Sequence, residues 1–538
     1  MADHNKLSVT ELLEMDNKSL VSIIVSLQGQ VSEISGQLGL LIEQLAVANQ
    51  RTFGRKSEKA SDNDQLSFFD LGLNLFNEAE ANSDDSNEPA ITEVTISGHT
   101  RKVKTSRDDQ LEGLPARVYN HVLSKEELTA LFPDGYKELP EEIYKRLSII
   151  PRTFLVDEHH VHVYASKKND GTIIRADRPA DLFRNSIATS SLVSAIITAK
   201  YSSHTPLERQ STAFKNDGIK LETNTLANWV ILSSEYYLSL IYEALHKDLY
   251  RSNVIHADET PCRVVRDGRD TNSKSYMWVY HSGTHVSKHP VVIYDYQQTR
   301  HHYHPKEFLK DYSGVLVTDG YQAYQALARK RDDLQVAGCW VHAKRKFAEL
   351  VKATPSNPDL GSTVAAEASS KISNIFHQDN KLDSLSKKDR EKQRLIVVKP
   401  LVDDFFAWAK EQLLHVPAGG ITFKGLMYCI NQEQFLRVFL KDGNVPMDNN
   451  LAERAIRPFT LGRKNWTIID SLQGAKASAM IYSIVETAKA NNLRIYDYIE
   501  LLLTELSKHQ DDTNLDFIED LLPWSESIQR QCHIKQKV

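Results

Sequence analysis

The chain has 538 residues, of which 41% are hydrophobic and 25% charged, and its formal net charge is −6. This composition is typical of a globular protein with several domains and a large core. The charge balance excludes a nucleic-acid role carried by the overall field of the protein, so any such role must rest on local basic patches.

Compartment signals in the sequence favour a cytoplasmic location. The four cysteines, Cys262, Cys339, Cys429 and Cys532, are widely scattered, which argues against a disulfide framework and fits a reducing cytosol. The first residues lack a signal-peptide pattern, and no apolar run approaches the roughly 18 residues of a membrane helix. We expect a cytoplasmic protein.

Residues 1–59 are predicted to contain a coiled coil followed by a basic segment. A 4-3 apolar repeat without a break runs through Leu20, Ile24, Leu27, Val31, Ile34, Leu38, Leu41 and Leu45. Such a narrow stripe predicts a helix that assembles the protein into a homo-oligomer. The alternative is an amphipathic helix packed on its own chain. The basic run 51–59 either contacts phosphates or is a solvated exit from the helix.

Two segments of simpler character follow. Residues 60–112 contain an acidic, Asn/Ser-rich piece and are predicted to be a linker. Residues 113–185 are predicted to form a small module with a strand over 154–164. His159, His160 and His162 in that run suggest a metal, but alternation puts only His160 and His162 on one face and no further ligand is evident. A surface strand is the preferred interpretation.

Residues 186–250 are predicted to be helical. The expected helices cover 192–201, 206–215 and 223–240, with a turn at Asp217-Gly218. This pattern fits a DNA-binding helix-turn-helix and a structural collar before the next domain equally well. In the first case the DNA contacts come from four cations on these helices, which are Lys200, Arg209, Lys215 and Lys220.

Residues 251–352 change to an α/β pattern. Short β-rich runs at 254–258, 276–280 and 291–294 predict an antiparallel meander. A strand over 314–319, a helix over 321–330, a strand over 334–339 and a helix over 341–352 follow. This is a ribonuclease-H-like order, and it places Asp258 and Asp319 at strand ends, where open α/β sheets carry their active sites.

The rest of the chain is predicted to be helical. Residues 353–445 are interpreted as an insertion with a charged, exposed stretch over 381–394, residues 446–474 as the completion of the core, and residues 475–538 as a helical carboxyl terminus broken at Asn491-Asn492. Pro458 is expected to stop or kink the helix that begins near Asn450. Glu453 in that helix is either a metal ligand or half of a capping box with Asn450, supported by an i,i+4 pair with Arg457.

Three carboxylates stand out from this pass along the chain, namely Asp258, Asp319 and Glu453, with Asp448 as the alternative third acid. Phosphodiester chemistry on two divalent metal ions needs hard oxygen ligands of this kind. Two acids on neighbouring strands and one on a helix can meet at one point. Arg454, Arg457, Arg463 and Lys464 near Glu453 would then face the phosphates of DNA.

Six stretches in order carry a family resemblance. They are F-G-R-K-S-E-K at 53–59, K-Y-S-S-H-T-P-L-E-R-Q at 200–210, H-A-D-E-T-P at 256–261, T-D-G-Y-Q-A-Y at 318–324, G-C-W-V-H-A-K-R-K-F at 338–347 and D-N-N-L-A-E-R-A-I-R-P-F-T-L-G-R-K-N-W at 448–466. With them the chain resembles a bacterial DDE transposase of the insertion-sequence 66 family. The family's catalytic acids fall on Asp258, Asp319 and Glu453, and its C-x-x-H element falls on Cys339 and His342.

The resemblance implies a function and a fold. It implies an α/β multidomain protein in which a ribonuclease-H-like catalytic core with a helical insertion follows an N-terminal coiled coil and a helical DNA-binding region. The activity implied is Mg²⁺-dependent hydrolysis at the element 3′ ends, for which Mn²⁺ can substitute, and transfer of the 3′-OH to target DNA. Small accessory proteins of the same element and association with the bacterial nucleoid are further expectations. A non-catalytic DNA-binding regulator and a nuclease without strand transfer are the alternatives.

Supporting residues remain open at this level. His342 either orders the active-site helix or a phosphate, or is a core histidine, and Trp466 either stacks on a base or packs in the core. Zinc is not expected, because the region that matches the family's Cys-rich module has no cysteine and Cys339 with His342 is half a zinc site at most. The candidate phosphate contacts are Lys200, Arg209, Lys344, Arg345, Lys346, Arg454, Arg457, Arg463 and Lys464.

Overall fold

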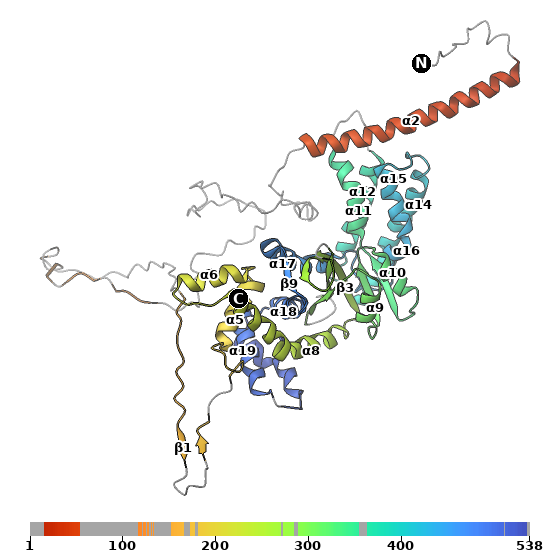
Figure 1. The fold of residues 1–538 in the computed structure, drawn as a ribbon. Helices are drawn as coiled ribbons and strands as arrows, with labels where there is room; N and C mark the ends of the chain where they lie inside the picture. Colours follow the sequence, from red (N-terminus) through yellow and green to blue (C-terminus); the bar gives the residue numbers. More distant parts are fainter. Residues whose placement is uncertain are drawn as a thin grey trace. The chain divides into compact units, whose positions relative to one another are not determined.

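In the computed structural model, whose fold is drawn in Figure 1, the chain divides into two units, 1–56 with 180–534, and 57–179 with 535–538. The residues that the structure describes are 16–53, 117–120, 122–124, 126–127, 131, 133, 152–165, 173–177, 181–270, 273–283, 289–353, 363–510 and 512–534. The predicted linker 60–112 and most of the basic run 51–59 lie outside them.

The N-terminal helix is confirmed as α2, Asn17–Phe53. Asp16 caps it, since its carboxylate accepts the backbone N–H of Ser19 at 2.8 Å. The apolar residues of the 4-3 repeat from Ile24 to Leu45 each expose more than half of their surface, from 52% for Ile24 to 65% for Val31. The stripe is therefore not buried within the single chain.

In the second unit the predicted strand over 154–164 is wrong. Only its end belongs to a strand, β1 (Val163–Ala165), which pairs antiparallel with β2 (Ile173–Arg175). Residues 152–162 have no ladder partner among the described residues, and alternating hydrophobicity alone does not make a strand without one. His159, His160 and His162 are exposed, and His160 lies 3.2 Å from the carboxylate of Glu158.

The helical segment before the sheet matches the prediction for its first two helices, α5 (Ser190–Tyr201) and α6 (Leu207–Asn216). Gly218 closes the turn with φ +85°. The third helix is longer than predicted, because α7 (Thr223–Ser233) continues through a π-helical turn, Ser234–Leu238, into α8 (Ser239–Leu249). The buried faces of these helices join the same core as the sheet and the C-terminal helices.

The centre of the first unit is a five-stranded mixed sheet in the order β6-β5-β3-β7-β8. Its strands are β3 (Val254–Cys262), β5 (Ser275–Ser282), β6 (Val292–Gln297), β7 (Gly314–Thr318) and β8 (Leu334–Gly338). β5 lies antiparallel between β3 and β6, whereas β3, β7 and β8 are parallel. The predicted meander followed by alternating helix and strand is confirmed as an order of elements. A separate two-stranded parallel sheet is formed by β4 (Val264–Arg266) and β9 (Ile469–Ser471).

Three helices connect or follow the later strands, namely α9 (Tyr303–Phe308), α10 (Gln322–Ala328) and α11 (Trp340–Ala353). The predicted insertion is helical, and its buried residues form one core with α11 and with residues of β3, β7 and β8. Its helices are α12 (Val364–Asn380), α13 (Lys387–Gln393), a π-helical turn (Arg394–Val398), α14 (Lys399–Gln412), α15 (Ile421–Asn431) and α16 (Glu433–Leu436), followed by a 3₁₀ turn at Val438–Lys441.

One expectation for the insertion is wrong at a single residue. Arg394, the last of the stretch predicted to be exposed, is fully buried. Its guanidinium binds both carboxylate oxygens of Asp379 at 2.7 and 2.9 Å and donates to the backbone carbonyls of Phe439, Asp442 and Val445. A buried charge is tolerated when it is paired and saturated with hydrogen bonds in this way.

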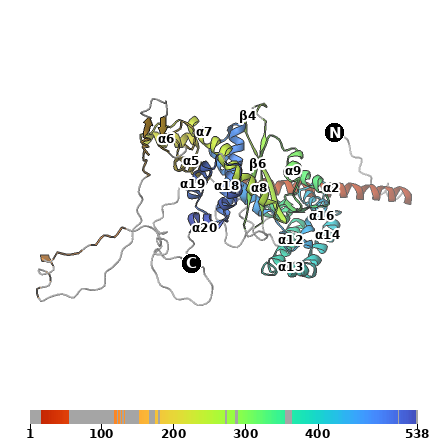
Figure 2. The same cartoon turned by 90° about the horizontal axis from the view of Figure 1, so that it is seen from below.

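The helix that carries Glu453 is also longer than predicted. α17 runs from Asn450 to Trp466 with Pro458 inside it. The missing N–H of a proline does not end a helix whose flanking residues are held by tertiary packing, and here Ala455, Ile456 and Phe459 are buried. The C-terminal helices α18 (Leu472–Ala490) and α19 (Ile495–Lys508) break at Asn491-Asn492 as predicted, and a 3₁₀ turn (Asp516–Leu521) and α20 (Glu526–Cys532) follow (Figure 2).

Candidate active site

The register of the central parallel pair brings two of the predicted acids to the same level. The last paired residues of β3 and β7 are His256 and Val317. Asp258 and Asp319 each come two residues later. Because side chains alternate between the two faces of a strand, both acids lie on the same face of the sheet as His256 and Val317. Asp258 is not at a strand end as predicted, because β3 continues to Cys262 as the antiparallel partner of β5; it lies where the parallel ladder ends.

Asp319 is held in a tight turn. Its carboxylate accepts the backbone N–H of Tyr321 at 3.1 Å, and its backbone carbonyl accepts the hydroxyl of Tyr428 at 2.9 Å. Gly320 has φ +96°, and a Cβ there would lie 2.9 Å from the Tyr428 hydroxyl. The D-G turn and the predicted ligand position are therefore compatible, since the turn fixes the direction of the acid.

Glu453 lies in the first turn of α17 and is 9% exposed. Its Oε2 is 3.5 Å from Nη2 of Arg345, and its Oε1 is 3.4 Å from Nδ1 of His342, both on α11. Neither Glu453 Oε1 nor His342 Nδ1 has a hydrogen-bond partner among the described residues. The carboxylate thus carries one oxygen that is buried without a hydrogen bond.

The predicted capping box at this helix start is wrong. Asn450 Oδ1 is buried without a hydrogen bond, and the N–H of Asn450 is bound instead by the carboxylate of Asp448 at 2.9 Å. The N-cap residue is Asn449, and its side chain makes no cap bond either. It reaches the central strand, where Nδ2 donates to the carbonyl of Ala257 at 2.8 Å and Oδ1 lies 3.0 Å from Nδ1 of His256.

The charge of Asp319 acts on both of the other predicted acids. Burial raises the pKa of Asp258 well above its usual range, and the charges of Glu259, Asp319 and Glu453 raise it further. Burial also raises the pKa of Glu453, with Asp319 and Asp448 adding to the shift and Arg345 opposing it. Three acids that come from β3, from the end of β7 and from α17 therefore share one negative, partly desolvated region.

Glu259 is a distinct case. Strand alternation places it on the face opposite Asp258, and Nε of Arg300 binds its carboxylate at 2.8 Å. Burial raises the pKa of Glu259 to about 7, and the charge of Asp319 acts in the same direction while Arg300 opposes both. Arg300 in turn stacks over the ring of Tyr321, 4.1 Å from its centre.

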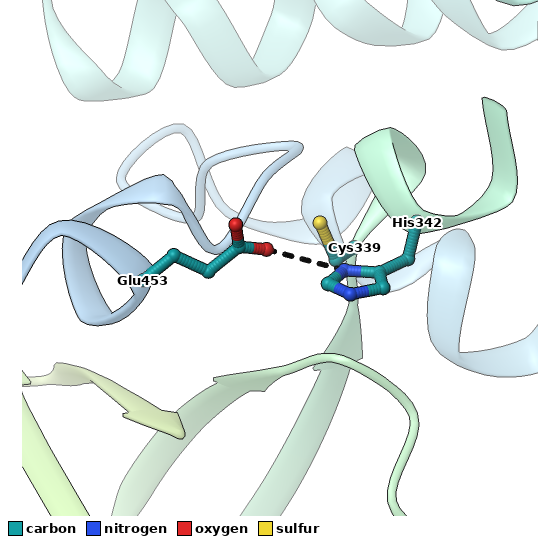
Figure 3. Close-up of side chains that lie close together, drawn as sticks. All are labelled: Cys339, His342 and Glu453. Carbon is teal, nitrogen blue, oxygen red and sulfur yellow. Dashed lines mark ion pairs between the residues drawn. The ribbon is translucent and has the colours of Figure 1, made fainter. Parts of the chain in front are cut away.

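A second cluster overlaps the first at Glu453 (Figure 3). Potential ligand atoms of Cys339, His342 and Glu453 lie within 4.8 Å of one another, and Figure 3 shows the three side chains converging from the loop after β8, from α11 and from α17. Burial raises the pKa of the Cys339 thiol to about 12 and lowers the pKa of His342 to about 4. At neutral pH His342 is therefore a neutral imidazole, and its approach to Glu453 is not a full ion pair.

The predicted phosphate contacts have different surroundings. Arg345 and Lys346 are exposed on α11, and Lys346 lies over the ring of Tyr428. Nη1 of Arg463 binds the hydroxyl of Thr260 at 3.1 Å, on the same strand as Asp258. Lys200 of α5 lies over the ring of Trp466, which packs half-buried against the core.

The remaining predicted contacts are distributed over three helices. Arg454 and Lys464 on α17 and Arg209 on α6 are exposed, whereas Arg457 on α17 and Lys344 on α11 are half-buried. Seven of the nine candidate cations therefore lie on α11 or on α17, the helix that carries Glu453, and four of these seven are exposed.

Sequence reasoning missed His256, Arg300, Tyr428 and the role of Asn449. Each acts through a partner that is distant in the chain, such as the 192 residues between Asn449 and Ala257. The Asp-Asn-Asn run before Glu453 indicates a helix start, and Asp448 in it is the alternative third acid, but nothing in the run indicates that Asn449 binds a distant strand.

Comparison with known proteins identifies the class. Residues 185–477 match the model of the family described as Transposase IS66 family, residues 483–524 match the IS66 C-terminal element, and residues 40–118 match Transposase C of IS166 homeodomain. The protein is thus a transposase. The chain belongs to the IS66 transposase family, since the first match spans more than half of its 538 residues.

Similar proteins occur in Sinorhizobium fredii. The uncharacterized proteins y4hP and y4qI are each 27% identical to this chain, over 402 and 397 residues, and each match covers 72% of this chain and 71% of the relative. The uncharacterized protein y4jD is 27% identical over 393 residues. No helix in the described part of the chain has the length and apolar character needed to span a bilayer.

Proposed function

We propose that this transposase binds the ends of its element, hydrolyses the phosphodiester at the element 3′ ends and transfers the freed 3′-OH to target DNA. The observation that supports the proposal is that the charge of Asp319 raises the pKa of both Asp258 and Glu453, which lie 61 and 134 residues away from it in the chain. Acids with pKa values shifted by burial and by like charges are typical of functional sites.

The donor set fits a hard divalent cation. The three carboxylates offer only oxygen ligands, and Glu453 Oε1 is buried without a hydrogen bond, which leaves it ready to bind an ion. Mg²⁺, or Mn²⁺ in its place, would supply activation of the attacking oxygen and stabilisation of the leaving oxygen. Asp258 and Asp319 would hold the ions from the sheet, and Glu453 would close the site from α17.

The surrounding cations would hold the DNA. Arg345 beside Glu453, and Arg454 and Lys464 on the exposed side of α17, are placed to bind phosphates that flank the cleaved bond. Arg463 would help to position the DNA strand, since its own side chain is held by a hydrogen bond to Thr260 on β3. The sheet order β6-β5-β3-β7-β8 supports the ribonuclease-H-like assignment of the core, because it puts the two strand acids on adjacent central strands.

The remaining parts of the proposal concern assembly and end recognition. The exposed apolar stripe of α2 supports a homo-oligomer through a coiled coil. The homeodomain match over 40–118 supports DNA binding by the N-terminal region, and the helices over 186–250 would add contacts through Lys200 and Arg209. We place the protein with the bacterial nucleoid and its element's small accessory proteins on the basis of the family alone.

The test is cleavage and strand transfer on a DNA duplex that carries one element end. Asp258→Asn and Glu453→Gln should each reduce Mg²⁺-dependent cleavage to background and leave end binding in a gel shift within about twofold, since each change removes one charge at constant shape. Asp404→Asn is the matched control, because that carboxylate is exposed on α14 and pairs with Lys371.

Two other outcomes would each favour an alternative. Full end binding without Mg²⁺-dependent cleavage by the wild type would favour a non-catalytic DNA-binding regulator. Cleavage without joining of a precleaved end to target DNA would favour a nuclease. Normal cleavage by Asp258→Asn or Glu453→Gln would contradict the assignment of the site.

A further inference from the structure

Cys339, His342 and Glu453 form a ligand set that differs in kind from the three acids. Their ligand atoms lie within 4.8 Å of one another, and they combine a thiol, an imidazole and a carboxylate. Glu453 is 9% exposed, and its Oε1 lies buried without a hydrogen bond 3.4 Å from Nδ1 of His342, which has none either. Two unsatisfied polar atoms that face each other beside a buried thiol are a costly arrangement for a purely structural site.

A bound ion would give Glu453 Oε1 and His342 Nδ1 the partner that each lacks. Atoms that ligate one tetrahedral zinc lie roughly 3.3–3.8 Å apart, given Zn–ligand distances of about 2.0–2.3 Å. The observed spread, within 4.8 Å, is wider than this, so the three side chains would rotate inward on binding the ion. The thiol selects a borderline-soft ion such as Zn²⁺ over Mg²⁺, and three protein ligands leave the fourth position to water.

We propose that Cys339, His342 and Glu453 form a Zn²⁺ site that competes with the proposed catalytic site for Glu453. Sequence reasoning found half of such a site, and the fold supplies the third ligand from α17, 111 residues after His342. When Zn²⁺ binds, the Cys339 thiol releases its proton to solvent and the sulfur becomes a thiolate ligand. Glu453 then binds Zn²⁺ and is withdrawn from the acids of the sheet.

The regulatory consequence rests on the proposed function, whereas the zinc site rests on the cluster itself. Because Mg²⁺ and Zn²⁺ would both need the Glu453 carboxylate, Zn²⁺ would inhibit the transposase. A chelator that removes Zn²⁺ would restore its activity. The N–H of Asn449 lies 3.3 Å from Sγ of Cys339 and so holds the start of α17 against the end of β8. This keeps Glu453 within reach of both proposed metal sites. Glu453 can therefore change partners through side-chain rotation, without a shift of its helix.

The first experiment uses full-length, chelator-treated protein and Co²⁺ as a spectroscopic substitute for Zn²⁺. We expect one equivalent of Co²⁺ to give a thiolate-to-metal charge-transfer band that Zn²⁺ removes. Cys339→Ser should lose the band, and Glu453→Gln should weaken Zn²⁺ binding at least about tenfold, the loss that even an outer-shell change causes. Cys429→Ser, at another fully buried cysteine, is the matched control and should keep the band.

Several results would overturn the zinc site. They are the absence of a thiolate band from the wild type, its survival in Cys339→Ser, and its loss in a folded Cys429→Ser. If Cys339→Ser does not fold, as judged by circular dichroism, His342→Gln takes its place, with loss of Zn²⁺ binding expected and unchanged binding contradicting the site.

The second experiment measures Mg²⁺-dependent cleavage of an element end with Zn²⁺ at increasing occupancy. We expect cleavage to fall in proportion to the occupied fraction and to return when a chelator is added. Zn²⁺ binding with unchanged cleavage would overturn the inhibition. Zn²⁺ binding by a protein that never cleaves with Mg²⁺ would overturn the proposed function and its inhibition, and would leave the zinc site standing.

Discussion

The side-chain amide of Asn449 donates a hydrogen bond to the backbone carbonyl of Ala257 at 2.8 Å, across 192 residues of chain. Its oxygen lies 3.0 Å from Nδ1 of His256, and its backbone N–H contacts the sulfur of Cys339. One fully buried residue thus ties the start of α17 to the strand that carries Asp258 and to the end of β8. This contact fixes where Glu453, one turn later, enters the site.

Replacement of Asn449 should therefore affect both stability and metal binding. Asn449→Ala removes the hydrogen bond to the Ala257 carbonyl and the contact with His256, and we expect a loss of about 1–3 kcal/mol in the free energy of unfolding. Because Asn449 positions the start of the helix that carries Glu453, the variant should also bind Mg²⁺ about 10–100-fold more weakly, so cleavage should need a correspondingly higher Mg²⁺ concentration. Urea unfolding and a Mg²⁺ titration of cleavage measure the two effects.

The control for Asn449 is Asn465→Ala. Asn465 is exposed and donates a single hydrogen bond to the carbonyl of His204 at 2.9 Å. It should change neither quantity appreciably. Equal effects of the two variants would contradict a positioning role for Asn449.

The exposed stripe of α2 predicts the oligomeric state. Leu27→Lys with Leu41→Lys places two charges at positions that are 52% and 55% exposed in the single chain, so the monomer should fold normally. The coiled coil should be lost, because charges at these positions disrupt its apolar contact surface. Light scattering after size-exclusion chromatography should report a smaller mass. Ser26→Lys, next to Leu27 and off the stripe, should keep the assembly, and an unchanged mass for the double variant would contradict the coiled coil.

Arg394 should be essential to the stability of the insertion. Arg394→Met leaves the buried carboxylate of Asp379 without its main partner and removes one donor from each of three backbone carbonyls, which should cost roughly 3–5 kcal/mol. Limited proteolysis should then cut within the insertion. Lys399→Met, which removes an exposed ion pair with Asp403, should cost under about 1 kcal/mol and leave the digestion pattern unchanged. Equal stability of the two variants would count against this role.

His281 predicts a stability loss in mild acid. Burial lowers the pKa of His281 to about 4, against roughly 6.5 in an unfolded chain. Between these values the unfolded state binds a proton that the folded state does not, so stability falls as the pH falls from about 6.5 towards 4, by at most about 1.4 kcal/mol per pH unit for this group. Urea unfolding at several pH values should show a shallower fall for His281→Gln.

The control for His281 is His302→Gln, at an exposed histidine. The free energy of unfolding of the His302→Gln variant should fall with falling pH in parallel with that of the wild type. His342 contributes in the same direction, since burial also lowers its pKa to about 4, so His281→Gln should reduce the slope without removing it. A slope equal to that of the wild type would contradict the assignment.

Local pattern predicted the elements of the sheet well. The β-rich runs around Asp258, Tyr280 and Val317 became strands in the predicted order, because apolar runs bounded by turn residues carry both length and direction. The helix breaks at Gly218 and Asn491-Asn492 were also predicted, since both depend on residues with special backbone preferences.

The failures share a physical cause, which is that tertiary contacts override local preference. Pro458 lies inside α17 because the buried face of the helix holds it, and Arg394 is buried because three backbone carbonyls from the far end of the insertion saturate it. Glu453 and the Cys339–His342 pair come together only through the fold. Spacing along the chain gave no measure of that distance, so the overlap of two ligand sets on one carboxylate could not be predicted.

The insertion between α11 and α17 has a consequence for synthesis of the protein. A growing polypeptide contains Asp258 and Asp319 long before residues 363–445 have been translated and have packed against α11 and the sheet. Only afterwards does Glu453 emerge. Under the proposed function, prematurely terminated copies would retain the early DNA-contacting segments yet be incapable of cutting, so they would occupy element ends and act as natural antagonists of the intact enzyme.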